Sequence, residues 1–382
     1  FGSCYIVDTY PASPGTRVGM YTDTDVGWVY PAVGHSANDS DANYGHPAHR
    51  GFQERIDADP ICFPDVPVGP LTHTLLKPAI EATRLDVPEY DIYVFENAES
   101  VYAATRIKRQ YPDSTVILLA AHRVFGLESY DFASDQFPKS LVRRADRYFD
   151  QALIRRFVRE HVDGVLAVSK HVERTVQSFA PVTPTEVVHP YVQPAFAAEL
   201  DGMTPSLESN HAITVCEGRD HKGVDMLVDA WEGVREYVPD ATLSIVGRNH
   251  PEEYESVSGV TVSGYVDNLA EEYSRASLYV HPARADAFGV TVLEAMRAGV
   301  VPMVTEATGS YPFVADVDDD LVVDPRAQSI ARGVVQYFQL PDEERRVRSE
   351  RSKGVTSPFV EDVKTREFEA QFRSLLARLS TI

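Results

Sequence analysis

Residues 278–307 read LYVHPARADAFGVTVLEAMRAGVVPMVTEA, and this stretch decides the fold. Two short apolar runs, at 278–283 and 301–307, flank a segment whose apolar residues recur at helical spacing. A strand, a helix and a strand in this order predict a βαβ unit with parallel strands. Two acidic residues stand out in the unit, because Asp286 precedes the helix and Glu294 lies among its apolar residues.

The same alternation of short strands and helical segments extends outward from this unit. It predicts an α/β fold of two doubly wound Rossmann-like domains, which face each other across a cleft at the carboxyl ends of their strands. The expected parts are an N-terminal extension at 1–16, a first domain at 17–190, a linker at 191–210, a second domain at 211–357 and a C-terminal helix at 358–382 that packs back across the seam.

Apolar runs mark the strands of each domain. In the first domain the expected strands are 17–22, 91–96, 115–120, 164–169 and 186–190, and no element is assigned within 35–75. In the second domain the expected strands are 212–218, 241–247, 260–266, 278–283, 301–307 and 320–325.

The composition excludes several classes of protein. The longest apolar run, VILLAA at 116–121, is much shorter than the roughly 20 residues of a membrane-spanning helix. The net charge of −21, with seven lysines among 36 basic residues, favours the surface of a halophilic, haloarchaeal protein and argues against nucleic acid as a partner. Three cysteines without a CxxC pair indicate a reducing compartment, and residues 1–16 lack the pattern of a secretory signal, so we expect a cytoplasmic protein.

Two basic residues follow the first strand of the second domain. Arg219 and Lys222 precede a helix, and the N-terminus of a second helix, at Phe288 and Gly289, belongs to the same domain. Cations beside helix N-termini favour an anion such as a diphosphate. The alternative is a solvated turn, with Asp286 as a helix cap and Glu294 reaching solvent.

Three blocks in this order resemble the nucleotide-sugar domain of the retaining glycosyltransferases of family four, which have the GT-B fold. The blocks are GRDHKGVDMLVDAW, LSIVG and VTVSGYVDNLAEEYSRASLYVHPARADAFGVTVLEAMRAGVVPMVTEATG, and they span about residues 212–310. Weaker matches to the first domain of that family are VDGVLAVSKHV at 162–172 and VVHPYVQPAF at 187–196.

The resemblance implies a role for particular residues. It implies that Glu294 binds the donor ribose and that Asp286 acts at the transferred sugar, together with the backbone at Phe288, Gly289 and Val290. It further implies that Arg219 and Lys222 bind the diphosphate, that Gly247, Gly264 and Val266 surround the base, and that His122 in the first, acceptor-side domain lies against the donor sugar and joins Asp286 as a catalytic residue.

The chain departs from the family pattern at several positions. Asp286 replaces a glutamate, Arg219 and Lys222 are two residues closer together than is usual, and Ser310 replaces the second glycine after Gly309. The loop expected after strand 17–22, DTDVGWVYP at 23–31, holds only Gly27 where the family has several glycines. These changes bear on the identity of the donor and on the geometry of the acceptor side.

The expected function is therefore retaining transfer of a sugar from a UDP- or GDP-sugar to a lipid-linked, polysaccharide or glycan acceptor, with no metal and no cofactor. Two alternatives keep the fold, namely a nucleotide-sugar epimerase and a non-catalytic regulatory subunit that binds the donor. A phosphorylase would need a cofactor-binding lysine region that the sequence does not show.

One segment is basic, although the chain as a whole is acidic. Residues 139–161 carry seven Lys or Arg and three acids, with apolar residues at helical spacing. Such a helix is typical of peripheral contact with anionic lipid at the inner face of the membrane, or of binding to a lipid-phosphate acceptor. The alternative is a core-packed helix whose arginines pair with surface acids.

Overall fold

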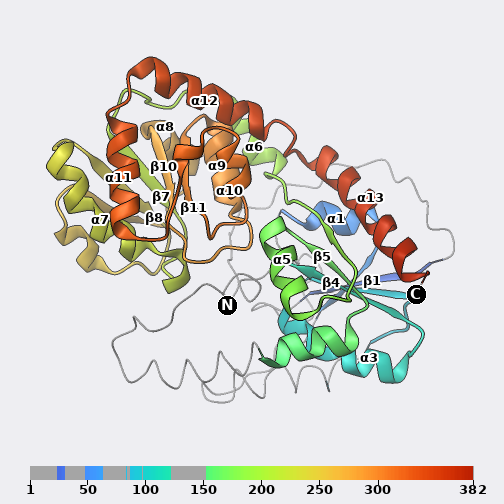
Figure 1. The fold of residues 1–382 in the computed structure, drawn as a ribbon. Coiled ribbons are helices and arrows are strands. Elements are labelled where there is room, and N and C mark those ends of the chain that lie inside the picture. The colour runs from blue at the N-terminus through green and yellow to red at the C-terminus, as the bar shows by residue number, and fades with distance from the viewer. Residues whose placement is uncertain are drawn as a thin grey trace.

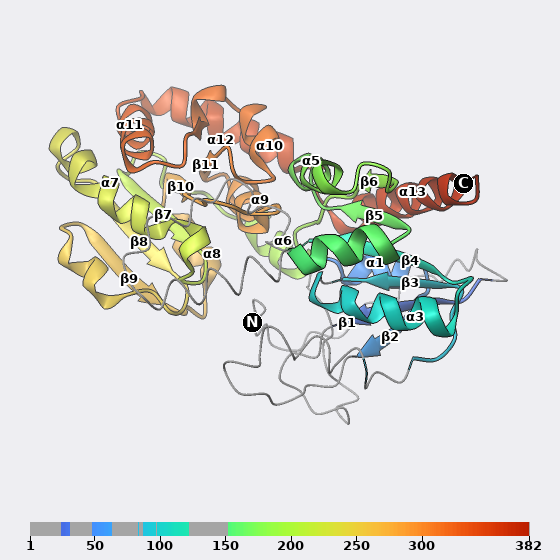
Figure 2. The same ribbon diagram turned by 60° about the horizontal axis from the view of Figure 1, so that its bottom comes forward.

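A computed structural model describes residues 24–30, 48–62, 83, 87–96, 98–121 and 152–381. These residues form two α/β units, each built on one six-stranded sheet, which lie side by side in Figures 1 and 2. The expected strand at 17–22, the extension at 1–16 and most of 35–75 lie outside the described residues.

The first sheet has the strand order β2-β1-β3-β4-β5-β6, and all its neighbouring strands are parallel. Large side chains such as Trp28, Tyr93 and Phe95 are completely buried between the sheet and its helices. The strands are β1 Val26–Tyr30, β2 Asp59–Cys62, β3 Ile92–Phe95, β4 Thr115–Ala120, β5 Gly164–Ala167 and β6 Thr185–Val187. The helices are α1 Arg50–Arg55, the 3₁₀ helix η1 Ala98–Ala103, α3 Ala104–Gln110, a helix at 152–161 and α5 Lys170–Phe179.

The interpretation of residues 23–31 as a glycine-poor loop was wrong. Val26–Tyr30 forms β1, which is fully buried and pairs with both β2 and β3. Valine, tryptophan and tyrosine favour a strand that is covered on both faces. Gly27 has a packing role there, because a Cβ at this position would lie 2.6 Å from Ile61 Cδ1.

The second sheet has the order β12-β11-β10-β7-β8-β9, again with parallel neighbours. The chain enters at β7, builds outward through β8 and β9, and then returns to β10 on the other side of β7. The sheet order thus reverses between β7 and β10, and ligands of such folds bind outside the carboxyl ends of the strands at this point. The strands are β7 His211–Val215, β8 Thr242–Val246, β9 Val260–Gly264, β10 Leu278–His281, β11 Val301–Thr305 and β12 Val322–Val323.

Helices cover both faces of this second sheet (Figure 2). On one face α7 packs against α11, and on the other α9 packs against α6, α8 and α12. The α-helices are α6 Pro194–Asp201, α7 Val224–Tyr237, α8 Leu269–Arg275, α9 Val290–Ala298, α10 Tyr311–Ala315, α11 Ala327–Phe338, α12 Asp342–Thr356 and α13 Glu361–Leu379. The 3₁₀ helices are η5 Asp220–Lys222, η6 Glu252–Ser256 and η7 Asp319–Leu321.

Two elements connect the units. The segment 191–210, which showed no periodicity, contains helix α6, and Arg297 of α9 holds it through an ion pair to Asp201 at 2.6 Å. The last helix, α13, returns to the first unit and packs against α1 (Figure 1). The Phe52 and Phe368 rings stack there with centroids 4.5 Å apart.

Candidate functional site

Two loops meet at the point where the order of the second sheet reverses. One follows β7 and carries Lys222, and the other follows β10 and carries Asp286. The Arg284 backbone N–H donates to the His221 carbonyl oxygen at 2.8 Å, which ties the loops together. Gly223, at φ +68°, permits this approach, because a Cβ there would lie 2.1 Å from the Pro282 carbonyl oxygen.

Asp286 is the centre of a compact charged cluster. Its Oδ2 accepts hydrogen bonds from Lys222 Nζ at 2.6 Å and from His281 Nε2 at 2.8 Å. Its Oδ1 accepts from the Phe288 backbone N–H at 3.2 Å. The Asp286 side chain is only 11% exposed, so these bonds lie largely away from water.

The cluster fixes the charge of its members. Burial acts to raise the pKa of Asp286, but the Lys222 ammonium and the hydrogen bond from His281 hold that pKa well below its usual range. Burial acts to lower the pKa of Lys222, and the Asp286 carboxylate more than offsets it, so the lysine pKa is raised. Burial lowers the pKa of His281. The cluster therefore holds a carboxylate, an ammonium and a neutral imidazole at pH 7.

Glu294 lies in the second turn of α9, where it is half-buried. Burial raises its pKa to about 7, against the opposing effect of the Tyr273 hydroxyl, which lies 3.4 Å from Glu294 Oε2. A carboxyl group can accept several hydrogen bonds, and the bond from Tyr273 is a long one. Hydroxyl groups of a ligand could donate to the same carboxyl.

Arg219 and Lys222 both lie in the loop after β7, as predicted. Arg219 pairs with Glu217, with Nη2 2.6 Å from Glu217 Oε2, whereas Lys222 pairs with Asp286. Each cation thus has a carboxylate partner in the chain itself. An incoming anion would have to compete with these partners.

The N-terminus of α9 lies at the expected position, directly after Phe288 and Gly289. Gly289 has φ +83° and directly precedes Val290, the first residue of the helix. Phe288 is buried and packs towards the first domain, where its ring centroid lies 5.9 Å from that of His189. The carbonyl of Ala287 accepts a hydrogen bond from Ser169 Oγ at 2.7 Å. The carboxyl-end loops of both sheets therefore meet beside Asp286.

Gly247, Gly264 and Val266 lie where β8 and β9 end. The Gly247 N–H donates to the Gly264 carbonyl oxygen at 2.7 Å, and both glycines have positive φ, +135° and +64°. The half-buried Val266 follows Tyr265, a residue that is 51% exposed and whose ring centroid lies 4.7 Å from the Arg248 guanidinium carbon. Arg248 and Tyr265 were not among the predicted site residues.

Gly247 should be intolerant of any side chain. A Cβ there would lie 1.8 Å from the Cys216 carbonyl oxygen, and its φ is strained for other residues. We expect Gly247→Ala to lower the free energy of unfolding by about 3 kcal/mol or more in urea titrations. Gly354→Ala is the control, because Gly354 is exposed within α12 with open space around its Cα, and it should stabilise by roughly 1 kcal/mol. Equal stabilities of the two variants would contradict this account.

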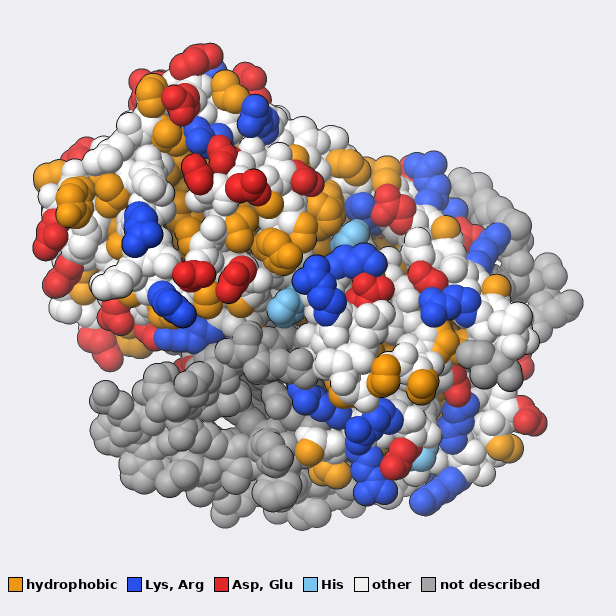
Figure 3. Space-filling view, viewed as in Figure 1, with side chains coloured by type: hydrophobic (Ala, Val, Ile, Leu, Met, Phe, Trp, Pro, Cys, Tyr) orange, Lys and Arg blue, Asp and Glu red, His pale blue; other side chains and the backbone are white. Residues whose placement is uncertain are grey.

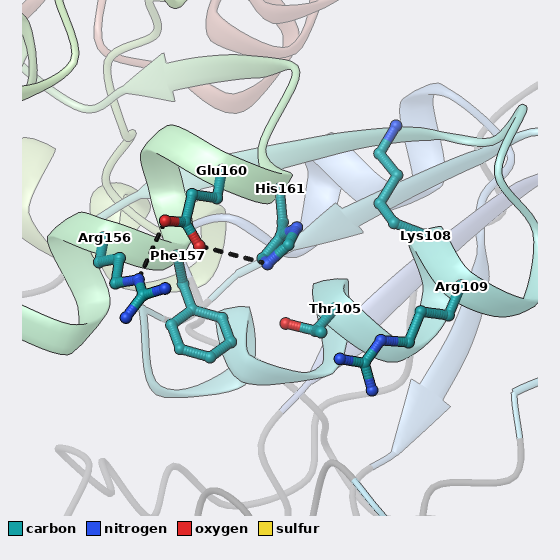
Figure 4. Close-up of a pocket in the computed structure, with 7 residues that line it drawn as sticks. All are labelled: Thr105, Lys108, Arg109, Arg156, Phe157, Glu160 and His161. Atoms are coloured by element: carbon teal, nitrogen blue, oxygen red, sulfur yellow. Dashed lines mark hydrogen bonds and ion pairs between the residues drawn. The ribbon is translucent and has the colours of Figure 1, made fainter.

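Two other predictions concern the first domain. His122 lies outside the described residues, as do residues 139–151 of the basic segment. The described part, 152–161, is a helix that packs through the buried Ile154 and Val158. Between it and α3 lies a pocket of about 540 Å³ (Figure 4).

Most charges in this pocket have acidic partners. Arg156 Nε donates to Glu160 Oε1 at 2.9 Å, and Lys108 Nζ lies 2.6 Å from Asp163 Oδ2. These pairs are what the alternative of a core-packed helix predicts. On the face that Figure 3 shows, Lys and Arg side chains are nevertheless frequent on the described part of this domain, and Asp and Glu side chains are frequent on the other domain. The part of the chain that the structure describes contains no helix long and apolar enough to cross a membrane.

The geometry around Lys222 and Asp286 can be compared with known proteins. Residues 211–339 match the family model for glycosyl transferases group 1. This segment contains the predicted site residues of the second domain, from Arg219 to Glu294. Within the match, the loops after β7 and β10 supply the charged cluster, and the ends of β8 and β9 supply the two glycines.

Two curated proteins are similar over part of their length. The lipopolysaccharide glucosyltransferase WaaG of Escherichia coli (strain K12) is 27% identical over 124 residues, 30% of this chain and 33% of WaaG. The mannosylfructose-phosphate synthase of Agrobacterium fabrum (strain C58 / ATCC 33970) is 30% identical over 123 residues, 28% of this chain and 27% of the synthase. The matches thus span about a third of these relatives. Over that part, the chain is similar to a glucosyltransferase and to a synthase.

Solved structures resemble the chain over both domains. α,α-Trehalose 6-phosphate synthase from Burkholderia multivorans aligns with TM-score 0.66 and 11% identity over 94% of this chain and 98% of that one. HepE from Anabaena, in complex with UDP-glucose, aligns with TM-score 0.63 and 12% identity over 92% of this chain and 100% of that one. At such low identity the likeness concerns the fold, and it confirms the predicted GT-B architecture of two parallel-sheet domains.

Proposed function

We propose that this chain is a retaining glycosyltransferase that transfers a sugar from a UDP- or GDP-sugar to a lipid-linked, polysaccharide or glycan acceptor. The observation that carries the proposal is the Lys222–Asp286–His281 cluster, held at the mouth of α9 inside the segment that matches glycosyl transferases group 1. The UDP-glucose in the structure of HepE supports a uridine donor.

The cluster suits the departure of a diphosphate from a sugar. Breaking the bond between the sugar and the diphosphate puts negative charge on the leaving group and positive charge on the ring. Lys222, Arg219 and the N-terminus of α9 would stabilise the leaving group by charge and hydrogen bonding, without a metal. Glu294 would accept hydrogen bonds from ribose hydroxyls.

Asp286 is suited to a supporting role in this reaction. Its carboxylate accepts bonds from Lys222, His281 and the Phe288 N–H, and such saturation makes it a weak nucleophile. A covalent sugar intermediate on Asp286 is therefore disfavoured. Retention would follow from attack by the acceptor on the face that the diphosphate leaves.

The acceptor side of the proposal rests on the Lys and Arg side chains that one face of the first domain presents (Figure 3). Arg156 remains 62% exposed beside the pocket of Figure 4, in a chain of net charge −21. A phosphate on a lipid-linked acceptor, or an anionic lipid at the inner membrane face, would be attracted to this surface. A cytoplasmic protein with peripheral membrane contact fits this arrangement.

One experiment tests the proposal. Purified protein is offered UDP- and GDP-sugars in high salt, which suits its acidic surface, and donor consumption is followed with and without acceptors presented in anionic vesicles. We expect one donor to be bound and slowly hydrolysed, and vesicles bearing a lipid-phosphate acceptor to accelerate its consumption. Binding without consumption would support the regulatory subunit, and conversion of the sugar without transfer would support the epimerase. Absence of binding to every donor would overturn all three.

A further inference from the structure

A buried chain of hydrogen-bonding side chains runs from Asp286 to Thr291, in the first turn of α9. His281 Nε2 lies 2.8 Å from Asp286 Oδ2, and His281 Nδ1 lies 3.1 Å from the Tyr279 hydroxyl. The Tyr279 hydroxyl lies 2.7 Å from Thr291 Oγ1 on α9. At the far end, the Tyr273 hydroxyl lies 3.4 Å from both the Thr291 carbonyl oxygen and Glu294 Oε2. Tyr279 and His281 can both take part because residues two apart on β10 share one face of the sheet.

The carboxylate at one end sets the direction of these bonds. An ionised carboxylate only accepts, so His281 must donate from Nε2. The neutral ring then accepts at Nδ1 from the Tyr279 hydroxyl, and the Tyr279 oxygen accepts from the Thr291 hydroxyl. His281 is 1% exposed and Tyr279 is fully buried, so water does not compete for these groups. One tautomer of His281, with the proton on Nε2, satisfies the whole chain.

This arrangement fixes Asp286 from three directions. Lys222 comes from the loop after β7, His281 from the end of β10 and the Phe288 N–H from the mouth of α9. With Lys222 as its sole partner, the carboxylate would swing with the ammonium when an anion drew the lysine away. The bonds from His281 and Phe288 instead keep the carboxylate in place. Asp286 then limits the directions in which the ammonium can point.

We infer that His281 is a positioning residue, which holds Asp286 so that Lys222 is aimed at the diphosphate of the nucleotide ligand. The inference rests on the proposed function, because it requires a diphosphate at Lys222. His281 acts through Asp286, and Tyr279 acts through His281 by fixing its tautomer.

The first test measures the affinity for UDP and GDP by calorimetry, together with kcat and KM for the donor. His281→Leu removes the donor to Asp286 at similar volume and should weaken nucleotide affinity by about tenfold or more, because the lost bond is to a charged group. His281→Gln can place an amide N–H near the position of Nε2, and it should recover affinity to within about threefold of the parent. Tyr279→Phe should show a smaller loss that does not add to that of His281→Leu.

A matched control separates positioning from general damage. His211, at the start of β7, lies in the same sheet and contacts Thr242 and Ser244, and it is remote from Asp286 along its strand. His211→Leu should leave nucleotide affinity unchanged. The inference is overturned if His281→Leu binds nucleotide like the parent, or if His281→Gln is as impaired as His281→Leu.

A second measurement does not depend on nucleotide or turnover. In protein with ¹⁵N-labelled histidine, the His281 signals, assigned by their loss in His281→Gln, should report a neutral ring protonated at Nε2 at pH 7. A charged ring or the other tautomer would overturn the inference even in an active enzyme. If the tautomer is as derived but no nucleotide binds, the proposed function fails, and the aiming of Lys222 fails with it.

Discussion

Replacing Lys222 by methionine is expected to lower kcat/KM for glycosyl transfer by about 10²- to 10³-fold, the usual effect of removing one donor that stabilises a developing oxyanion. Methionine keeps much of the apolar length of lysine and removes its charge. Lys222 is the cation that the loop after β7 brings to the mouth of α9, with its Nζ 2.6 Å from Asp286. Steady-state transfer assays with the donor identified from the panel measure the effect.

A second lysine provides the control for that experiment. Lys170 on α5 is 61% exposed and pairs with Glu173 at 2.8 Å in the first domain. Lys170→Met should leave kcat/KM within about twofold of the parent, because exposed pairs of this kind contribute little. Parent-like turnover by Lys222→Met would remove Lys222 from the site.

Loss of the Lys222 ammonium should also lower the free energy of unfolding. A double variant separates this effect on stability from the effect on kcat/KM. Lys222→Met leaves the buried Asp286 carboxylate with fewer donors and should lower the free energy of unfolding by about 1–3 kcal/mol. Adding Asp286→Asn removes the uncompensated charge and should recover much of that stability. Activity should stay low in the double variant, since the cation is still absent.

Glu294→Gln is expected to stabilise the chain above pH 7 while it weakens nucleotide binding by about tenfold. Burial raises the pKa of Glu294 to about 7 in the folded chain, from 4.5 when exposed. Below pH 4.5 the carboxyl is protonated in both the folded and the unfolded chain, so its burial does not reduce the free energy of unfolding. Between pH 4.5 and 7 the unfolded chain releases the proton first, so the free energy of unfolding falls as pH rises. Above pH 7 the full cost is present, up to about 3 kcal/mol.

Urea unfolding at several pH values measures this effect. The parent should lose stability from pH 5 to pH 7 relative to Glu294→Gln, and the two should converge near pH 4. Glu350→Gln, on the exposed face of α12, is the matched control and should follow the parent at every pH. A constant difference between parent and Glu294→Gln across this range would show that Glu294 is not held in a buried, proton-retaining site.

The second domain was predictable because its strands are short, apolar and bounded by turns. Buried parallel strands have no polar face, so a run such as residues 278–283 is recognisable without tertiary information. The first domain was harder. β1 follows another apolar run, at 17–22, which competes with it for assignment as the first strand of the domain. β2 is a four-residue edge strand that contains Pro60, and proline argues against a strand except at the edge of a sheet.

The charged loops of the site were also predictable, whereas the buried hydrogen bonds that hold Asp286 in place were not. Lys222 and Asp286 stand in loops after strands, where polar residues indicate a ligand site. His281 and Tyr279 stand inside an apolar strand, and nothing local distinguishes them from core residues. Their importance depends on Thr291 of α9, which only the folded structure brings within hydrogen-bonding distance.

Helix α13 has a consequence for the order in which this protein can fold during synthesis. Its Phe368 stacks on Phe52, and its Leu375 fills the space beside Gly164, so residues from the end of the chain complete the core of the first domain. The ribosome releases residues 361–379 only after the whole second domain has been made. The second domain can therefore fold while the first domain still exposes part of its core. A nascent chain held before residue 361 should bind chaperones through its first domain, although that domain was synthesised first.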